Sequence, residues 1–183
     1  MAALRESLPP GQERARELLD RALAQGGRTL AEIRRVIADL RPTALDDLGL
    51  IPALRAYAEE RLTPAGVKLD FLVTGAVRRL HPPTETALFR ILQEAVTNVA
   101  RHAKARTARV QIDFTPTSLT GVVEDDGRGF EMPGRPRDPR AGVGLQGMQE
   151  RADLIRARLQ IASRLGGGTR VRVEVPLEVR DEG

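Results

Sequence analysis

A change in the hydrophobic pattern at Pro42 constrains the fold of this 183-residue chain more than any other feature. Before Pro42, residues 11–41 carry apolar or small residues at steps that alternate between four and three, as in a helix of a coiled coil or four-helix bundle. These residues are Leu19, Leu23, Gly26, Leu30, Ile33, Ile37 and Leu40. Because proline ends a helix, we expect one long bundle-type helix that stops at Pro42. Such an apolar stripe rarely stays in water, so it predicts a homodimer formed through residues 11–41.

After Pro42, segments with strand periodicity alternate with segments of helical periodicity. Alternating or apolar runs predict strands at 67–73, 110–114, 118–125, 158–164 and 171–175. Apolar residues at helical spacing predict helices at 50–62, 83–103 and 145–158. Most neighbouring strands can pair as antiparallel hairpins with the helices on one face. The order therefore predicts an α/β protein, a two-layer α/β sandwich.

Composition excludes several classes of protein. The chain has no cysteine, which excludes disulfides, thiolate metal sites and a cysteine nucleophile, and which fits an intracellular protein. No apolar run approaches the roughly 20 residues that span a bilayer. Lys and Arg number 29 against 25 Asp and Glu, they are interspersed with the acids, and only five aromatic residues are available to stack on bases. We expect no nucleic-acid partner, no membrane segment and a cytoplasmic location, with a membrane anchor left open for a longer parent protein.

The predicted helix at 89–103 is the most informative segment for function. Its apolar stripe comprises Leu88, Ile91, Leu92, Ala95 and Val99. Glu94, Asn98 and His102 fall at i, i+4 and i+8 on the other face. Asparagine is unfavourable inside a helix, and a Mg²⁺ ion that takes oxygen ligands from Asn98 and, through water, from Glu94 would explain it. The simpler alternative is a solvated face on which Glu94 pairs with Arg90 or another nearby base.

A second motif, VVEDDGRGF at 122–130, joins an apolar strand to a glycine turn. A carboxylate at the strand end, Asp125, can accept a hydrogen bond from an exocyclic amine such as that of adenine. Gly127 and Gly129 would let a flat ring approach the backbone closely. A tight turn in which aspartate and glycine serve only the turn geometry explains the same residues.

Two further glycine motifs follow. Gly142 and Gly144 precede a helix, whose free N–H groups and dipole form a site for anions such as phosphate. The motif is neither a P-loop nor a dinucleotide fingerprint. Gly166, Gly168 and Thr169 stand where the last strand begins, and a hairpin turn is the simple explanation there.

The order of these four motifs resembles the N box and the three glycine boxes of the Bergerat-fold ATPases. The segments ADLRPTALDDLGLIPAL (38–54), QEAVTNVARHA (93–103) and GLQGMQERA (144–152) are similar to sensor histidine kinases of bacterial two-component systems, in the nitrate-sensor and DesK-like subgroup. The resemblance covers essentially the whole chain. It implies a mixed sheet with helices on one face, and ATP and Mg²⁺ as cofactors.

The resemblance also implies roles for the matching residues. Asn98 would be the Mg²⁺ ligand, Glu94 the catalytic acidic residue and Asp125 the residue that binds the adenine amine. The other cofactor-binding residues would be Arg101, His102, Gly127, Gly129, Gly142, Gly144, Leu145 and Thr169. Residues 130–142 would be the ATP lid, a mobile cover over the phosphates.

One part of the family pattern is missing. The phosphoacceptor histidine of this family lies on the first helix of a dimerisation domain, whereas the two histidines here are His81 and His102. We expect residues 1–42 to be a partial dimerisation domain and residues 43–183 the catalytic ATP-binding domain. The chain would then be a fragment that binds ATP but cannot phosphorylate itself. Its partners would be a response regulator and the phosphoacceptor region of the parent kinase.

Two other interpretations stay open at this point. A serine kinase of the anti-sigma-factor type shares the ATP site and needs no dimerisation helix, although the helix at 11–41 and the LRPTALDDLGL junction argue against it. A non-catalytic module with a degenerate ATP site would use its bundle helix to bind a partner, although all four motifs are intact.

Overall fold

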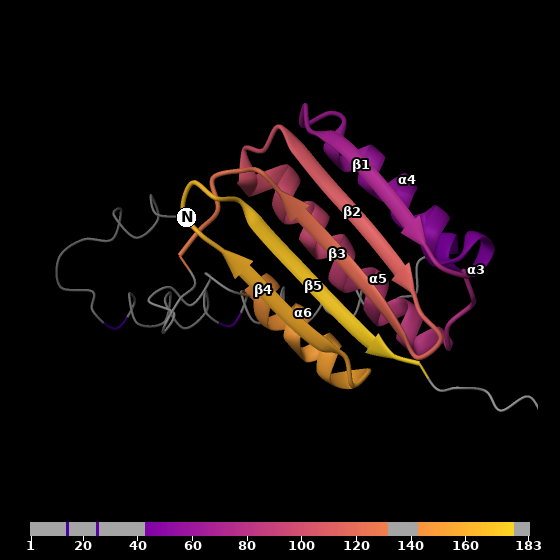
Figure 1. Ribbon diagram of the computed structural model, residues 1–183. Coiled ribbons are helices and arrows are strands. Elements are labelled where there is room, and N and C mark those ends of the chain that lie inside the picture. Colours follow the sequence, from indigo (N-terminus) through magenta and orange to yellow (C-terminus); the bar gives the residue numbers. More distant parts are fainter. Residues whose placement is uncertain (1–13, 15–24, 26–42, 132–142, 178–183) are drawn as a thin grey trace, which may run out of the picture. The chain divides into compact units, whose positions relative to one another are not determined.

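The structure is a computed structural model that describes residues 43–131 and 143–177, together with Arg14 and Gln25. The helix expected at 11–41, its dimer contact, Gly142 and nearly all of the expected lid lie outside the described residues. The described residues from Thr43 to Leu177 form one compact unit. The elements of this unit are α3 (Thr43–Leu48), α4 (Leu50–Leu62), β1 (Lys68–Thr74), α5 (Pro82–Asn98), η1 (Val99–Ala103), β2 (Thr107–Phe114), β3 (Ser118–Asp125), α6 (Val143–Leu154), β4 (Arg158–Ser163) and β5 (Thr169–Pro176) (Figure 1).

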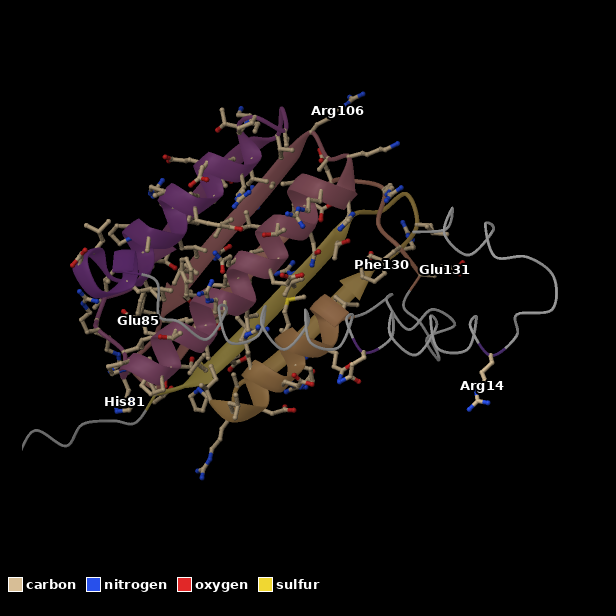
Figure 2. The ribbon with its side chains drawn as sticks, turned by 180° about the vertical axis from the view of Figure 1, so that it is seen from behind. Arg14, His81, Glu85, Arg106, Phe130 and Glu131 are labelled. Carbon is tan, nitrogen blue, oxygen red and sulfur yellow. The ribbon has the colours of Figure 1, made fainter. Side chains whose placement is uncertain are left out.

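The five strands form one mixed sheet in the order β1-β2-β3-β5-β4. The pair β1–β2 is parallel, and the other three pairs are antiparallel. The parallel pair arises because the chain crosses over through α5 between these two strands, whereas a short hairpin joins β2 to β3. The helices α4, α5 and α6 cover one face of the sheet (Figures 1 and 2). The expected α/β sandwich with a mixed sheet is confirmed.

The apolar stripe of α5 packs onto the centre of the sheet. Its five residues are all at most 5 % exposed. Gly121 of β3 lies directly beneath this stripe, because a Cβ added there would stand 3.1 Å from both methyl groups of Leu92. Each fully buried leucine or isoleucine contributes about 2 kcal/mol through removal of apolar surface from water. This packing holds α5 in place, so the polar face of α5 has a defined position relative to the sheet.

Two predicted helices have ends that differ from those in the structure. The helix predicted at 145–158 begins at Val143 and ends at Leu154. It stops because Arg156 adopts a left-handed φ of 53° and the N–H of Ala157 returns to the carbonyl of Ala152. The helix predicted at 83–103 begins at Pro82, and its last five residues form the π-helix η1. Apolar spacing alone does not distinguish a π-turn from an α-turn.

A buried carboxylate ties the start of α5 to α3. Glu85, in the first turn of α5, is 2 % exposed. Arg79 donates from one Nη1 atom to Glu85 Oε1 at 3.5 Å and to the carbonyl of Leu45 at 3.1 Å. The guanidinium group also lies against Gly49, where an added Cβ would stand 3.0 Å from Nη1. Arg79 therefore attaches α3, the first helix of the compact unit, to the start of α5, the helix that carries the polar face.

Candidate functional site

A cleft of ≈ 530 Å³ opens between the second half of α5, the ends of β3 and β5, and the start of α6. Eight residues singled out from the sequence line it: Glu94, Asn98, His102, Asp125, Gly129, Gly144, Leu145 and Thr169. Arg101 and Gly127 do not line the cleft, and Gly142 lies outside the described residues. Residues more than 70 positions apart thus meet at one site, whose volume is in the range of small-molecule sites.

Sequence reasoning missed the apolar floor of the cleft. The floor comprises Ala95, Val99, Ala103, Val123 and Val171. All five are buried, and their periodicity is that of ordinary core residues. Arg128, Phe130 and Glu131 also line the cleft; they belong to or follow the motif around Asp125, so their position in the sequence was the available signal. An apolar floor with a few polar groups at its ends suits an aromatic ring.

Asp125 forms one polar end of the cleft. Its side chain is 8 % exposed, and its Oδ1 accepts a hydrogen bond of 2.8 Å from the N–H of Gly127. Burial raises the pKa of the Asp125 carboxyl, and the charges of Asp126 and Glu124 act in the same direction. Backbone hydrogen bonds from Gly127 and Thr169 oppose this rise without cancelling it. A buried carboxylate with free acceptor capacity can take a donor such as an exocyclic amine.

Asp126, the next residue, has a structural role instead. Its Oδ1 accepts the N–H groups of Arg106 and Thr107 at 2.8 and 2.9 Å, and its Oδ2 accepts the hydroxyl of Thr107 at 2.9 Å. These hydrogen bonds, the one from the Thr107 backbone first, lower the pKa of Asp126. The side chain is exposed and fixes the start of β2. Two neighbouring aspartates thus differ in their surroundings, because Asp125 lines the cleft and Asp126 is bound to the backbone at the start of β2.

Glycines hold the backbone around Asp125 in contact with two other segments. A Cβ on Gly127 would stand 2.7 Å from Asp125 Oδ1 and closer still to the carbonyl of Ala103. Gly168 has a φ of +71°, and a Cβ there would overlap the carbonyl of Asp125. The N–H of Gly168 donates to the carbonyl of Gly127 at 2.9 Å, and the N–H of Arg128 donates to Ala103 at 2.8 Å. The backbone at this end is therefore closely packed without bound ligand.

The π-helix η1 carries the last residues of the polar face. Both Arg101 and His102 are exposed, but only His102 lines the cleft. Lys104 ends the helix in a left-handed conformation with a φ of 51°. Short π-helical turns in proteins are often associated with functional sites, because the wider turn changes the direction of side chains.

Glu94 and Asn98 form the other polar end of the cleft. Both side chains are half-buried, and no hydrogen bond or ion pair joins either of them to another residue in the part of the chain that the structure describes. Arg90 directs its Nη1 to Gln93 Oε1 at 2.6 Å. The first turn of α6 lies beside Glu94, since a Cβ added to Gly144 would overlap Glu94 Oε1. Two oxygen-bearing side chains are thus available to a ligand.

The family model described as "Histidine kinase-, DNA gyrase B-, and HSP90-like ATPase" matches residues 84–179, the range that contains every described part of the cleft. The chain belongs to this ATPase family. Within it the relatives are sensor kinases of two-component systems, so the resemblance inferred from the sequence is confirmed. Members of this family bind ATP, and the five-stranded mixed sheet with helices on one face is the fold of the histidine kinase ATPase domain.

The chain is 38% identical over 153 residues to the signal transduction histidine-protein kinase/phosphatase DegS of Brevibacillus brevis, which covers 84% of this chain and 39% of the relative. It is 33% identical over 165 residues to the oxygen sensor histidine kinase NreB of Staphylococcus carnosus, covering 88% of this chain and 47% of the relative. The chain therefore spans less than half the length of these relatives.

The fold is similar to that of the histidine kinase domain of the blue-light activated histidine kinase of Erythrobacter litoralis. The TM-score is 0.59 at 22% sequence identity, and the match covers 100% of this chain and 95% of that domain. Among the described residues, no helix has both the length and the apolar character needed to cross a membrane.

Proposed function

We propose that the cleft binds ATP together with Mg²⁺ and that the domain transfers the γ-phosphoryl group to a histidine of a two-component sensor kinase. The observation that carries this proposal is the arrangement of three side chains at the two ends of one apolar-floored cleft in an ATPase family member. One is the buried carboxylate of Asp125, and the other two, Glu94 and Asn98, carry oxygens that no other described residue engages. ATP has the matching order of groups, an amine on a flat ring at one end and phosphates at the other.

Asp125 would recognise adenine. Its buried carboxylate accepts the exocyclic amine of the base, while the ring lies on the apolar floor that includes Val99 and Val171. Guanine carries an oxygen where adenine carries the amine, so a carboxylate acceptor would repel it. Thr169, opposite Asp125 in the β3–β5 pairing, borders the same end.

Asn98 would hold Mg²⁺ jointly with the phosphates, and Glu94 would reach the ion through water. Among the described residues, no group of three or more His, Cys, Asp or Glu side chains is placed to hold a metal ion by itself. Mg²⁺ commonly takes one or two protein oxygens and completes its octahedron with water and phosphate oxygens. The amide oxygen of Asn98 and the carboxylate of Glu94 fit this requirement. The bound ion would neutralise charge on the β- and γ-phosphates.

In the transfer step, the bond between the γ-phosphorus and the β–γ bridging oxygen breaks while a bond to an imidazole nitrogen forms, and ADP leaves. The proton on the other imidazole nitrogen passes to a base, for which Glu94 is the candidate. Catalysis then rests on positioning and charge neutralisation rather than on covalent chemistry of this domain.

Neither histidine of this chain is suited to accept the phosphoryl group. His81 caps the start of α5, thirteen residues before Glu94, a separation of about 20 Å along a helix. Figure 2 shows His81 at the opposite end of α5 from Phe130. His102 is part of the cleft wall. We therefore infer that another segment or polypeptide supplies the acceptor, that residues 1–42 serve dimerisation, and that a response regulator receives the group.

The test is a calorimetric titration with ATP and Mg²⁺ of three proteins: the wild-type chain, Asp125→Asn and the matched control Asp126→Asn. We expect micromolar affinity, about 8 kcal/mol, for the wild type. Asp125→Asn should weaken binding at least tenfold, about 1.4 kcal/mol, because the amide presents a donor to the adenine amine. Asp126→Asn should leave the affinity within about twofold, since its hydrogen bonds point to β2.

Absence of ATP binding by the wild-type chain would refute the proposal and favour a module with a degenerate site. Equal weakening by the two substitutions would refute the role of Asp125. Incubation of the chain with γ-labelled ATP should leave both histidines unlabelled, and label on either one would refute an external acceptor.

A further inference from the structure

Gly144 of α6 lies directly against Glu94 of α5 inside the cleft. A Cβ built on Gly144 would overlap Glu94 Oε1 and would stand 3.3 Å from its Cδ. Both residues line the cleft. The backbone of the first turn of α6 therefore lies directly against the Glu94 carboxylate, in a space that only a glycine leaves open.

This contact constrains Glu94 without a hydrogen bond. Among the described residues no donor pairs with the Glu94 carboxylate, so packing against α6 limits where it can lie. The position is also electrostatically favourable, because the first turn of a helix carries partial positive charge. A methyl group at residue 144 would displace the end of a flexible side chain, which is a small change for the fold and a large one for the carboxylate.

We propose that Gly144 is a positioning residue that keeps the Glu94 carboxylate at the phosphate end of the cleft, in the orientation needed for phosphoryl transfer. This inference rests on the proposed function. It assigns Gly144 a role in the orientation of the catalytic residue, in addition to any contact of its own with phosphate.

Gly147 provides a matched control three residues further along α6. A Cβ there would meet only the Arg151 side chain, with Nη1 at 2.9 Å and Cζ at 3.9 Å, which is again the end of one flexible side chain. Gly147 does not line the cleft. Replacement by alanine raises helix propensity at both positions, so the two variants differ chiefly in the side chain that must move.

The first measurement is the ¹³C resonance of the Glu94 carboxyl carbon in the 183-residue chain, assigned with Glu94→Gln. Gly144→Ala should shift this resonance, and Gly147→Ala should leave it unchanged. An unchanged resonance in Gly144→Ala would overturn the inference, whatever the chain does with nucleotide.

The second measurement is hydrolysis of MgATP, in which water takes the γ-phosphoryl group in place of the external histidine, followed as release of ADP and phosphate. Gly144→Ala should lower kcat at least tenfold and leave KM within twofold, while Gly147→Ala changes neither. Combining Gly144→Ala with Glu94→Asp, whose shorter side chain leaves room for the methyl group, should cost less than twofold relative to Glu94→Asp alone.

Other results would distinguish failure of the Gly144 inference from failure of the proposed ATP-dependent function. If Gly144→Ala raises KM and the loss persists in the Glu94→Asp background, residue 144 acts on the nucleotide directly and the inference fails while the proposed function stands. If the wild-type chain neither binds nor turns over ATP, the proposed function fails, and the role of Gly144 in phosphoryl transfer fails with it.

Discussion

The two ends of the cleft are built in different ways. Around Asp125, hydrogen bonds from Gly127 and close contacts of Gly168 hold the backbone before any ligand arrives. Around Glu94 and Asn98, no hydrogen bond to the described residues engages either side chain. If the cleft binds ATP as proposed, the end that recognises the base is organised in advance, which lowers the entropic cost of binding, whereas the phosphate end would be completed by its ligands.

The largest effect should come from breaking the prearranged end. Gly168→Ala places a methyl group on the carbonyl of Asp125 at a φ of +71° and should lower the free energy of unfolding by about 3 kcal/mol. Gly166 has a similar φ of +73° but no atom within 4 Å of an added Cβ. Gly166→Ala should therefore cost only about 1 kcal/mol.

Urea denaturation of the two variants measures this difference as a shift of the midpoint at constant slope. Equal losses would mean that the left-handed conformation alone, and not the contact with Asp125, makes glycine necessary at residue 168.

A second prediction sharpens the contrast at the open end. Glu94→Gln removes a negative charge near the proposed phosphate position, and Asn98→Asp adds one. Affinity for ATP without metal should rise about fivefold in Glu94→Gln and fall about fivefold in Asn98→Asp, about 1 kcal/mol each. Mg²⁺ should therefore enhance ATP binding less in Glu94→Gln than in the wild type, and more in Asn98→Asp than in the wild type.

Calorimetric titrations with and without Mg²⁺ test this prediction, and each variant serves as the control for the other. A change of the same sign in both would show that the phosphates do not lie near these residues.

The smallest effect concerns pH and the two neighbouring aspartates. The pKa of Asp125 is raised in the folded protein, so its favourable contribution to stability is present below the usual aspartate pKa and is lost as pH rises through the raised value. Asp126 has a lowered pKa, so its contribution is present at neutral pH and is lost as pH falls.

We compare the free energy of unfolding of each variant with that of the wild type. For Asp125→Asn this difference should be more favourable to the variant at pH 7 than at pH 3. For Asp126→Asn it should be less favourable to the variant at pH 7 than at pH 3. Thermal unfolding at both pH values gives the comparison. The same sign of pH dependence in both variants would contradict the assignment of one aspartate to the cleft and the other to the backbone of β2.

Much of the fold followed from local pattern. The alternation at Val171, Val173 and Val175 and the apolar stripe of α5 were interpreted correctly, and all of these residues are buried. The parallel pairing of β1 with β2 was not visible, because a strand's own sequence does not name its partner. The buried Glu85 was not singled out, since a carboxylate in the first turn of a helix is usually a solvated residue near the helix dipole.

The candidate site likewise has residues that the sequence identified and features that it could not reveal. Motif types and their order were sufficient to name Glu94, Asn98, Asp125 and Thr169, and all four line one cleft. The lid at 130–142, the helix at 11–41 and the division of the chain at residue 42 stay predictions. Asp126 could not be separated from Asp125 by sequence, because both follow the same strand and only their partners distinguish them.

The sequence by itself determined which segments are helices and strands, which family they belong to and which residue types are available for nucleotide chemistry, because these depend on periodicity and on motif order. Only the tertiary structure decided that Asp125 is buried and Asp126 exposed, that α5 ends in a π-helix, and that Gly144 lies against Glu94. Each of these depends on contacts between residues far apart in the chain, and burial, hydrogen bonding and close approach exist only once those residues have been packed together.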